Sequence, residues 1–310
     1  MKEIALGVVW LPVSFVNVYF VGERGQPWVL VDTGMPGRSQ QIVSAAEEIY
    51  GAHARPEAII LTHGHFDHAG SVLDLADIWS VPVYAHRLEM PYLTGQSDYP
   101  PPDPTIGGFM AFLSRFLPSA GIDLGDRIHE LPPNGEVPGL PAWDWHFTPG
   151  HTPGHISLFR RADKTLLVGD AFATTNYDSF MAAATQKQEI ARGGSPFTSD
   201  WMATWRSVAH LAGLTPFTVA CGHGIPMTGA SVDDQLWRFV RKFPVPSHGR
   251  YALAPARTGE NGVESLPPAP PDPMPKIVAG VGMAAIAGAT LLAARRRKRE
   301  TEQEAEGSRQ

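Results

Sequence analysis

Cysteine is almost absent from this sequence, which has 310 residues and a single cysteine, Cys221. One cysteine excludes an internal disulfide bond and fits a reducing compartment. Positive charge is not in excess either, since 25 Lys and Arg stand against 31 Asp and Glu and give a formal net charge of −6. Because nucleic-acid-binding surfaces are rich in Lys and Arg, we expect no nucleic-acid partner.

A secretory signal pattern is also missing from the first residues. Lys2 is followed by the acidic Glu3, and the stretch over 4–20 is interrupted by Pro12 and Asn17 without a small-residue cleavage site. The stretch instead predicts two strands, over 4–10 and 15–21, joined around Pro12.

Histidine, by contrast, is abundant, with 12 in the chain. Four metal-binding side chains follow the apolar run over 58–61 directly: His63, His65, Asp67 and His68. The run predicts a buried strand, and Gly64 allows the chain to turn tightly as it leaves. Three imidazoles and a carboxylate crowded at a strand end lose hydration unless a cation holds them together. The cluster therefore indicates a metal site rather than a His-rich surface loop.

The remaining pattern alternates strands with helices, twice over. Further strands are predicted over 28–31, 81–84, 127–131, 143–147, 156–159, 166–168 and 217–220. Helices are predicted over 38–50 and 71–78, over 200–211 with Ser199 as N-cap, and from Ser231, where Asp234 completes a capping box, to Lys242. This order predicts an α/β sandwich in which two sheets pack together with helices outside.

Three more candidate ligands follow predicted strands, each beside glycine: His151, Asp170 and His223. Glycine allows close backbone approach to a site, and loops at strand ends commonly carry chemistry. Each residue alone would be an ordinary polar residue. Together with the first cluster, they indicate one shared site.

These residues, in this order, resemble the metallo-β-lactamase fold superfamily, and the glyoxalase II-like branch carries the full ligand set. The resemblance covers residues 1–243 and includes the turn Asp32-Thr33-Gly34 after an early strand. It implies a catalytic domain folded as an αββα sandwich of two mixed β-sheets flanked by helices. It is specific for fold and only weakly specific for substrate.

The resemblance also implies a two-metal site. His63, His65 and His151 would bind one metal, Asp67, His68 and His223 the other, and Asp170 would bridge them. Asp67 and Asp170 are thus expected to be catalytic as well as metal-binding. Imidazole and carboxylate ligands without thiolate suit Zn²⁺, with Fe or Mn as alternative occupants. Asp32 is expected to orient a ligand by hydrogen bonds, His155 to be structural, and Cys221 to be a small buried thiol.

Two cations of this kind can hold a bridging hydroxide and polarise a carbonyl. We therefore expect a hydrolase of a small-molecule thioester, lactone or related ester. Two branches of the superfamily act on such substrates, the glyoxalase II enzymes and the quorum-sensing lactonases, and the sequence matches neither fully. Gly224 is not followed by the arginine that is frequent in the glyoxalase II branch. The lactonases typically have a tyrosine a few residues past the bridging aspartate, and Tyr177 is the nearest candidate for it. The alternatives are a mononuclear-iron oxidoreductase of the same fold, similar to a persulfide dioxygenase, and a non-catalytic metal-binding module.

The segment over 109–117 has apolar residues at helical spacing. Such a set most often packs in a core, and the alternative is a lid that lines an apolar substrate pocket near the metals.

The chain changes character after Phe243. Residues 244–275 are rich in proline and predict an extended linker. An uncharged run over 277–294 then predicts a single transmembrane helix, with bounds 276–294, followed by a charged tail over 295–310. Gly280, Ala284 and Gly288 share one helical face and could support self-association. We expect this hydrophobic helix to anchor the chain to membrane lipid with the catalytic domain on the cytoplasmic side, although the basic cluster over 295–299 favours the opposite orientation.

Overall fold

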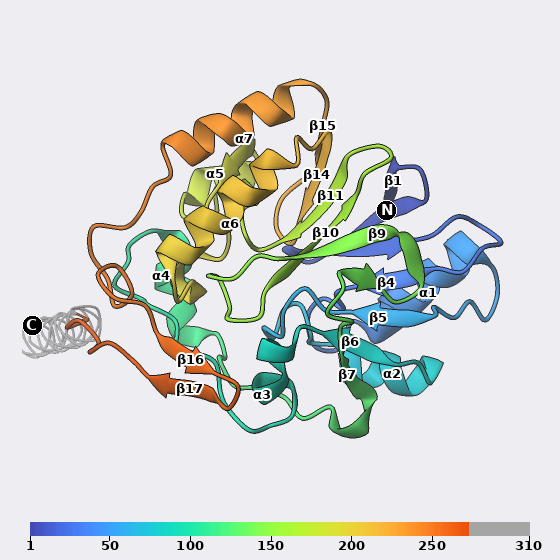
Figure 1. Cartoon of the computed structure of the whole chain (residues 1–310), viewed down its shortest axis with the longest axis horizontal. Coiled ribbons are helices and arrows are strands. Elements are labelled where there is room, and N and C mark those ends of the chain that lie inside the picture. Colours follow the sequence, from blue (N-terminus) through green and yellow to red (C-terminus); the bar gives the residue numbers. More distant parts are fainter. Residues whose placement is uncertain (273–310) are drawn as a thin grey trace, which may run out of the picture. The chain divides into compact units, whose positions relative to one another are not determined.

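Two β-sheets pack face to face in the computed structural model of this protein, which describes residues 1–272 (Figure 1). The apolar layer between them includes Val31 and Ile60 from one sheet and Ile156 and Leu167 from the other. Burial of each such aliphatic side chain stabilises the fold by roughly 1.5–3 kcal/mol. The layer between the sheets is therefore a main source of stability.

The first sheet follows the order of the chain from edge to edge. It comprises β1 (Lys2–Ala5), β2 (Val8–Val13), β3 (Val16–Val21), β4 (Val29–Val31), β5 (Ala58–Ile60), β6 (Val83–Ala85) and β7 (Ile128–Glu130). Strands β1 to β4 pair antiparallel, and β4 to β7 pair parallel. Because parallel strands end at the same edge of a sheet, the loops that follow β4 and β5 are neighbours.

The second sheet has the order β15-β14-β11-β10-β9-β8. Its strands are β8 (Glu136–Val137), β9 (Leu140–Phe147), β10 (Ile156–Arg160), β11 (Thr165–Gly169), β14 (Thr218–Cys221) and β15 (Met227–Thr228). Strand β11 runs parallel to β14, and β10 is antiparallel to both β9 and β11. Strands β9, β11 and β14 therefore share a direction, and the loops that follow them leave the same edge.

Helices cover the outer face of each sheet. On the first sheet lie α1 (Ser39–Tyr50) and α2 (Val72–Trp79), and on the second lie α6 (Trp201–Gly213) and α7 (Ser231–Arg241) (Figure 1). Helix α1 buries Ile42, Ala45, Ala46 and Ile49, the residues at helical spacing in the sequence. The predicted αββα sandwich of two mixed sheets is confirmed.

The remaining elements of the described chain are short. They are α3 (Met90–Leu93), α4 (Phe109–Leu113), α5 (Phe180–Thr185), 3-10 helices at Arg87–Glu89, Ser114–Phe116, Gly125–Arg127 and Ser195–Phe197, and the strand pairs β12 (Ala173–Thr175) with β13 (Gln188–Ala191) and β16 (Arg257–Gly259) with β17 (Gly262–Ser265).

Several boundaries differ from the prediction. Pro12 lies inside β2, opposite Asn17, and the turn falls at Ser14 instead, where φ is +65°. Strand β1 pairs with β2 only as far as Trp10, so the missing N–H of Pro12 costs no ladder bond on that side. Asp200, not Ser199, caps α6 and accepts from the Ala203 N–H at 2.8 Å. Helix α7 begins without a side-chain cap, so the capping box predicted at Ser231 is wrong.

The segment after Phe243 is more ordered than an extended linker. Tyr251 is 3% exposed, packs with Ile106 and Trp201, and donates to the Pro101 carbonyl at 2.7 Å. The hairpin of β16 and β17 follows, and one compact unit extends from Met1 to Ala269. Tyr251 thus packs against the domain within a segment whose composition predicts only an extended linker. None of the helices in residues 1–272 is long and apolar enough to span a membrane, and the hydrophobic helix predicted over 276–294 lies outside the described residues.

Candidate metal centre

The seven predicted ligands converge at one edge of the sandwich, where strands from both sheets end. His63, His65, Asp67 and His68 lie on the loop after β5. His151, Asp170 and His223 follow β9, β11 and β14, the three strands that share a direction in the second sheet. All seven are buried, with at most 8% of each residue exposed. The two sheets thus contribute to one site.

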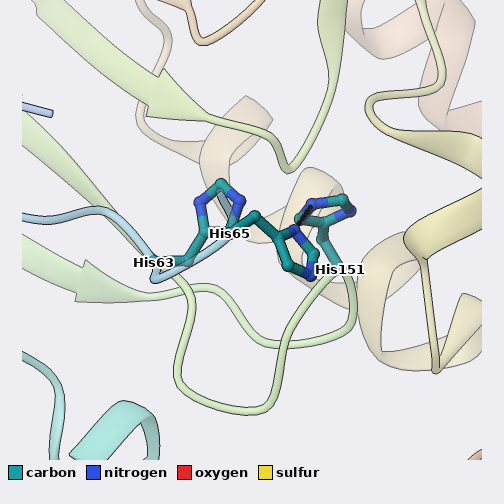
Figure 2. Close-up of side chains that lie close together, drawn as sticks. All are labelled: His63, His65 and His151. Carbon is teal, nitrogen blue, oxygen red and sulfur yellow. Dashed lines mark hydrogen bonds between the residues drawn. The ribbon is translucent and has the colours of Figure 1, made fainter. Parts of the chain in front are cut away.

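Three imidazoles form the first group, which we call the imidazole triad: His63, His65 and His151 (Figure 2). Figure 2 shows His65 turned toward His151, and the His65 Nδ1 and His151 Nε2 atoms are 3.0 Å apart. The outer Nδ1 of His151 lies 3.2 Å from the Thr198 hydroxyl, which itself donates to the Gly193 carbonyl. That hydroxyl therefore accepts from the His151 Nδ1–H, which leaves the Nε2 lone pair of His151 free to bind a metal ion.

The second group, which we call the mixed triad, contains Asp67, His68 and His223. The His68 Nδ1 atom lies 2.8 Å from the Asp32 carboxylate, and the His223 Nδ1 atom lies 2.8 Å from the Phe15 carbonyl. Both partners accept hydrogen bonds, so each imidazole carries its proton on Nδ1 and turns Nε2 inward. The His223 Nε2 atom is 3.4 Å from the Asp67 carboxylate.

Asp170 lies between the two triads. Its carboxylate oxygens are 3.5 Å from His68 Nε2, 3.6 Å from His151 Nε2 and 3.2 Å from His223 Nε2. Within the described chain, His63 Nε2, His68 Nε2 and the Asp170 Oδ1 atom are buried without a hydrogen-bond partner. Buried polar atoms rarely stay unpaired, and a cation shared among them would compensate all three. The residues present therefore fit a metal centre.

Burial and charge act differently on the two triads. Burial lowers the pKa of His65 to about 4 and the pKa values of His63 and His151 well below 6.5, because each imidazolium would lose hydration. Burial acts the same way on His68, but the carboxylates of Asp170 and Asp32 raise its pKa to about 9. The mixed triad thus lies in a negative field that favours a cation.

Asp32 supports the mixed triad from the end of β4. Its carboxylate accepts from the Thr62 N–H and from the Thr62 hydroxyl, both at 2.8 Å, in addition to the contact with His68. The Thr62 hydroxyl in turn lies 3.1 Å from His63 Nδ1 and accepts a hydrogen bond from the Nδ1–H group. This geometry agrees with the orienting role predicted for Asp32. Its carboxylate holds both the His68 ring and Thr62, at the start of the loop after β5.

Glu89 is a supporting residue that the sequence did not reveal. It is fully buried, and its carboxylate accepts from the Gly64 N–H at 3.0 Å, from the Tyr99 hydroxyl, and from the Thr152 hydroxyl and Gly154 N–H at 2.7 Å each. Burial raises the pKa of Glu89, and these donors oppose the increase. Glu89 therefore cross-links the two loops that carry the imidazole triad.

Asn17 has a similar role beneath the mixed triad. Its side-chain amide donates to the Cys221 carbonyl at 2.9 Å and to the Gly224 carbonyl at 2.6 Å, on either side of His223. The Trp10 indole fixes the amide by donating to its oxygen at 2.8 Å. A polar residue inside a strand of otherwise apolar residues was the sequence feature that could have marked it.

The other predicted residues have structural roles. The His155 Nε2 atom accepts from the Asp170 N–H at 2.8 Å, while Nδ1 lies 3.1 Å from the Thr148 carbonyl, so both ring nitrogens are paired. Cys221 is fully buried, and burial raises the pKa of its thiol, which keeps it protonated. A side chain at Gly64 would meet Tyr99 and Leu93, so close packing, more than the turn itself, requires glycine there.

The segment over 109–117 lines cavities beside the metal centre and also packs in a core. Ala111 is 1% exposed and clusters with Trp201 and Tyr251, whereas Met110 and Leu117 line a pocket of about 30 Å³ over the candidate ligands. The pocket-lining alternative therefore describes one face of this segment and the core alternative describes the other.

A model of the metallo-beta-lactamase superfamily matches residues 11–223, which include all seven candidate ligands. The chain belongs to this superfamily. Among its relatives, the probable metallo-hydrolase YflN of Bacillus subtilis (strain 168) is 44% identical over 237 residues, 76% of this chain and 90% of that protein. The hydroxyacylglutathione hydrolase GloC of Haemophilus influenzae is 26% identical over 144 residues, 46% of this chain and 59% of that protein. The link to the glyoxalase II-like branch is therefore distant.

Solved structures of the metallo-beta-lactamase superfamily share the architecture. The BLEG-1 B3 metallo-beta-lactamase has a TM-score of 0.52 and 25% sequence identity over 74% of this chain and 97% of that chain. MEM-A1, a subclass B3 metallo-beta-lactamase isolated from a soil metagenome library, has a TM-score of 0.51 and 21% identity over 78% of this chain and 83% of that chain. The likeness to MEM-A1 is one of fold.

Proposed function

We propose that this chain is a two-metal hydrolase that cleaves a small ester-type substrate, such as a thioester or a lactone. Its general class, a metal-dependent hydrolase of the metallo-beta-lactamase superfamily, is supported by the matched family, by the YflN relative and by the His/Asp clusters. The observation that carries the two-metal proposal is the pair of triads with Asp170 between them.

The proposed metal ligands are those of the two triads. His63, His65 and His151 would hold one ion, with the lone pairs of His63 and His151 freed by hydrogen bonds to Thr62 and Thr198, and Asp67, His68 and His223 would hold the other. When bound, two divalent cations supply Lewis acidity and lower the pKa of water toward neutrality. Imidazole and carboxylate donors suit Zn²⁺, and Fe or Mn would fit the same donors.

The chain's own residues orient the ligands and restrict water. Asp32 and the Phe15 carbonyl fix the rings of His68 and His223, and Glu89 joins the loops of the imidazole triad. Burial raises the pKa of Asp67, but the neighbouring imidazoles of His223 and His68 bring it below its usual value, so the carboxylate stays ionised. The pocket over the ligands has apolar walls that include Phe66 and Phe197, so few waters share it with a substrate.

Metal analysis combined with a substrate panel tests the proposal. The full chain, loaded separately with Zn²⁺, Mn²⁺ or Fe²⁺, would be assayed against an ester, a thioester, a lactone and a phosphodiester. We expect two metals per chain and hydrolysis of at least one of the first three substrates. One tightly bound iron per chain, without hydrolysis, would instead support the iron oxidoreductase. An intact fold with no activity in any metal form would support a binding module.

The membrane anchor over 276–294 stays a separate proposal, carried by sequence alone. Membrane fractionation with protease protection of a C-terminal tag measures both attachment and orientation. Recovery of the full chain in the unattached fraction would contradict the anchor.

A further inference from the structure

A second, larger cavity opens beside the metal centre and has a volume of about 320 Å³. Its walls come from α4 and the residues after it, from α5 and from the loop after β2, and they consist of Phe15, Phe109, Met110, Leu113, Leu117, Tyr177, Phe180, Ala183, Ala184 and Gln186. Among the described residues, no charged side chain lines it. The cavity is therefore suited to an uncharged, apolar ligand.

The polar groups in this wall are already paired. The Tyr177 hydroxyl donates to the Gln186 side-chain oxygen, with 3.3 Å between the two atoms. Phe109 and Phe180, both in the wall, meet edge to face with ring centroids 5.2 Å apart. A ligand in the cavity would therefore gain little from hydrogen bonds and would bind by burying apolar surface.

The cavity adjoins the pocket over the candidate metal ligands, and the two share part of their walls. Phe15, Met110 and Leu117 line both the large cavity and the 30 Å³ pocket over the ligands. Phe15 also stacks on His223, with ring centroids 5.9 Å apart and the ring planes at 13°. A molecule that places its reacting group over the triads can thus extend directly into the apolar cavity.

We propose that the cavity binds a linear aliphatic chain attached to the scissile ester or thioester group, so that the substrates are aliphatic esters of medium chain length. This inference rests on the proposed hydrolase function and names its substrate class. The volume equals roughly ten water molecules at ~30 Å³ each. A methylene group needs about the same space, so the chain would have roughly eight to ten carbons. Phe180 is 60% exposed and places the far end of the chain near solvent.

The first test is the dependence of rate on chain length. The metal-loaded full chain would be assayed by proton release with p-nitrophenyl esters from acetate to dodecanoate and, in a second series, with alkyl acetates. We expect kcat/KM to rise roughly fourfold per methylene and to level off near eight to ten carbons, since each buried methylene adds that factor. The series that shows this rise identifies the side of the ester that carries the chain.

A variant that fills the cavity shows whether the cavity sets this preference. Ala183→Trp on α5 should lower the octanoate-to-acetate ratio of kcat/KM at least about 15-fold, because the added indole removes room for two or more methylenes. Thr185→Trp is the matched control, because Thr185 is exposed on the same helix and is not part of the wall. Leu113→Trp, from the opposite wall, repeats the test if Ala183→Trp folds poorly.

Binding of 1-octanol provides a readout that does not need catalysis. Calorimetry on metal-free and metal-loaded protein should show binding with a negative heat-capacity change, weakened at least tenfold by Ala183→Trp. Octanol binding without hydrolysis of any ester would contradict the hydrolase function and leave the aliphatic site standing. Hydrolysis with a flat chain-length profile and no octanol binding would overturn the site and leave the hydrolase function standing.

Discussion

The two triads hold metal-binding groups of similar type but are supported in different ways. The imidazole triad depends on loops from two sheets that Glu89 joins, and its rings are neutral because burial lowers their pKa values. The mixed triad is supported ring by ring, by Asp32 and the Phe15 carbonyl, within a field of carboxylates. Because few supporting contacts are shared, substitutions should affect the two metal positions separately.

The largest effect is expected where the triads meet. Asp170→Asn removes a carboxylate that lies within 3.6 Å of ligand atoms from both triads. Zinc sites of four ligands have binding free energies of ~10–16 kcal/mol. Loss of one ligand should therefore lower the affinity for each metal on the order of 10²-fold. Metal content per chain and hydrolysis of the best ester should both fall. Retention of two tightly bound metals would contradict the bridging position of Asp170.

A smaller and more selective effect is expected from Asp32→Asn. The substitution replaces the acceptor of the His68 Nδ1 proton and disturbs the contacts with Thr62. Residues that hydrogen-bond to ligand histidines typically contribute about 10–100-fold in metal affinity. The metal affinity of the mixed triad should therefore fall by that factor. Cadmium NMR, with one resonance per metal position, measures which position is lost. Equal weakening of both positions would show that Asp32 acts through the whole loop.

The counterpart for the imidazole triad is Glu89→Gln. Each carboxylate oxygen of Glu89 accepts from one backbone N–H and one hydroxyl, so the NH₂ group of glutamine would leave one backbone N–H without an acceptor, while the hydroxyl beside it can turn and accept. An unpaired buried donor costs about 1–3 kcal/mol, which is the expected loss in the free energy of unfolding. Denaturant unfolding measures the loss of stability. Cadmium NMR should show weaker binding at the imidazole triad, whereas Asp32→Asn should weaken binding at the mixed triad.

The candidate ligands could be found from sequence because each follows a strand that a short apolar run reveals. His63, His65, Asp67 and His68 are local, His151, Asp170 and His223 each stand beside glycine after a predicted strand, and the resemblance to a known family implied how the seven divide between two metals. The supporting groups could not be predicted in this way. Glu89 contacts Gly154 across 65 residues and Asn17 contacts Gly224 across 207, and no local pattern encodes such pairs.

The fold shows the same division. The layers followed from periodicity, since the apolar residues of α1 and of the strands mark their buried faces. The turn at Ser14, the cap at Asp200 and the anchoring of Tyr251 depend on which neighbour each residue meets. Such neighbours are set by tertiary packing, which a single sequence shows least directly.

The smallest expected effect separates ring orientation from loop position within the imidazole triad. Thr198→Val keeps the shape of the side chain and removes the hydroxyl that accepts from His151 Nδ1 at 3.2 Å. One net hydrogen bond is about 1 kcal/mol, so metal affinity at this position should fall roughly fivefold. Thr94→Val is the control, because its hydroxyl bonds only to the nearby Met90 carbonyl on an exposed turn. If Thr198→Val weakened the metal as much as Glu89→Gln, the His151 ring, rather than the joined loops, would limit binding in the imidazole triad.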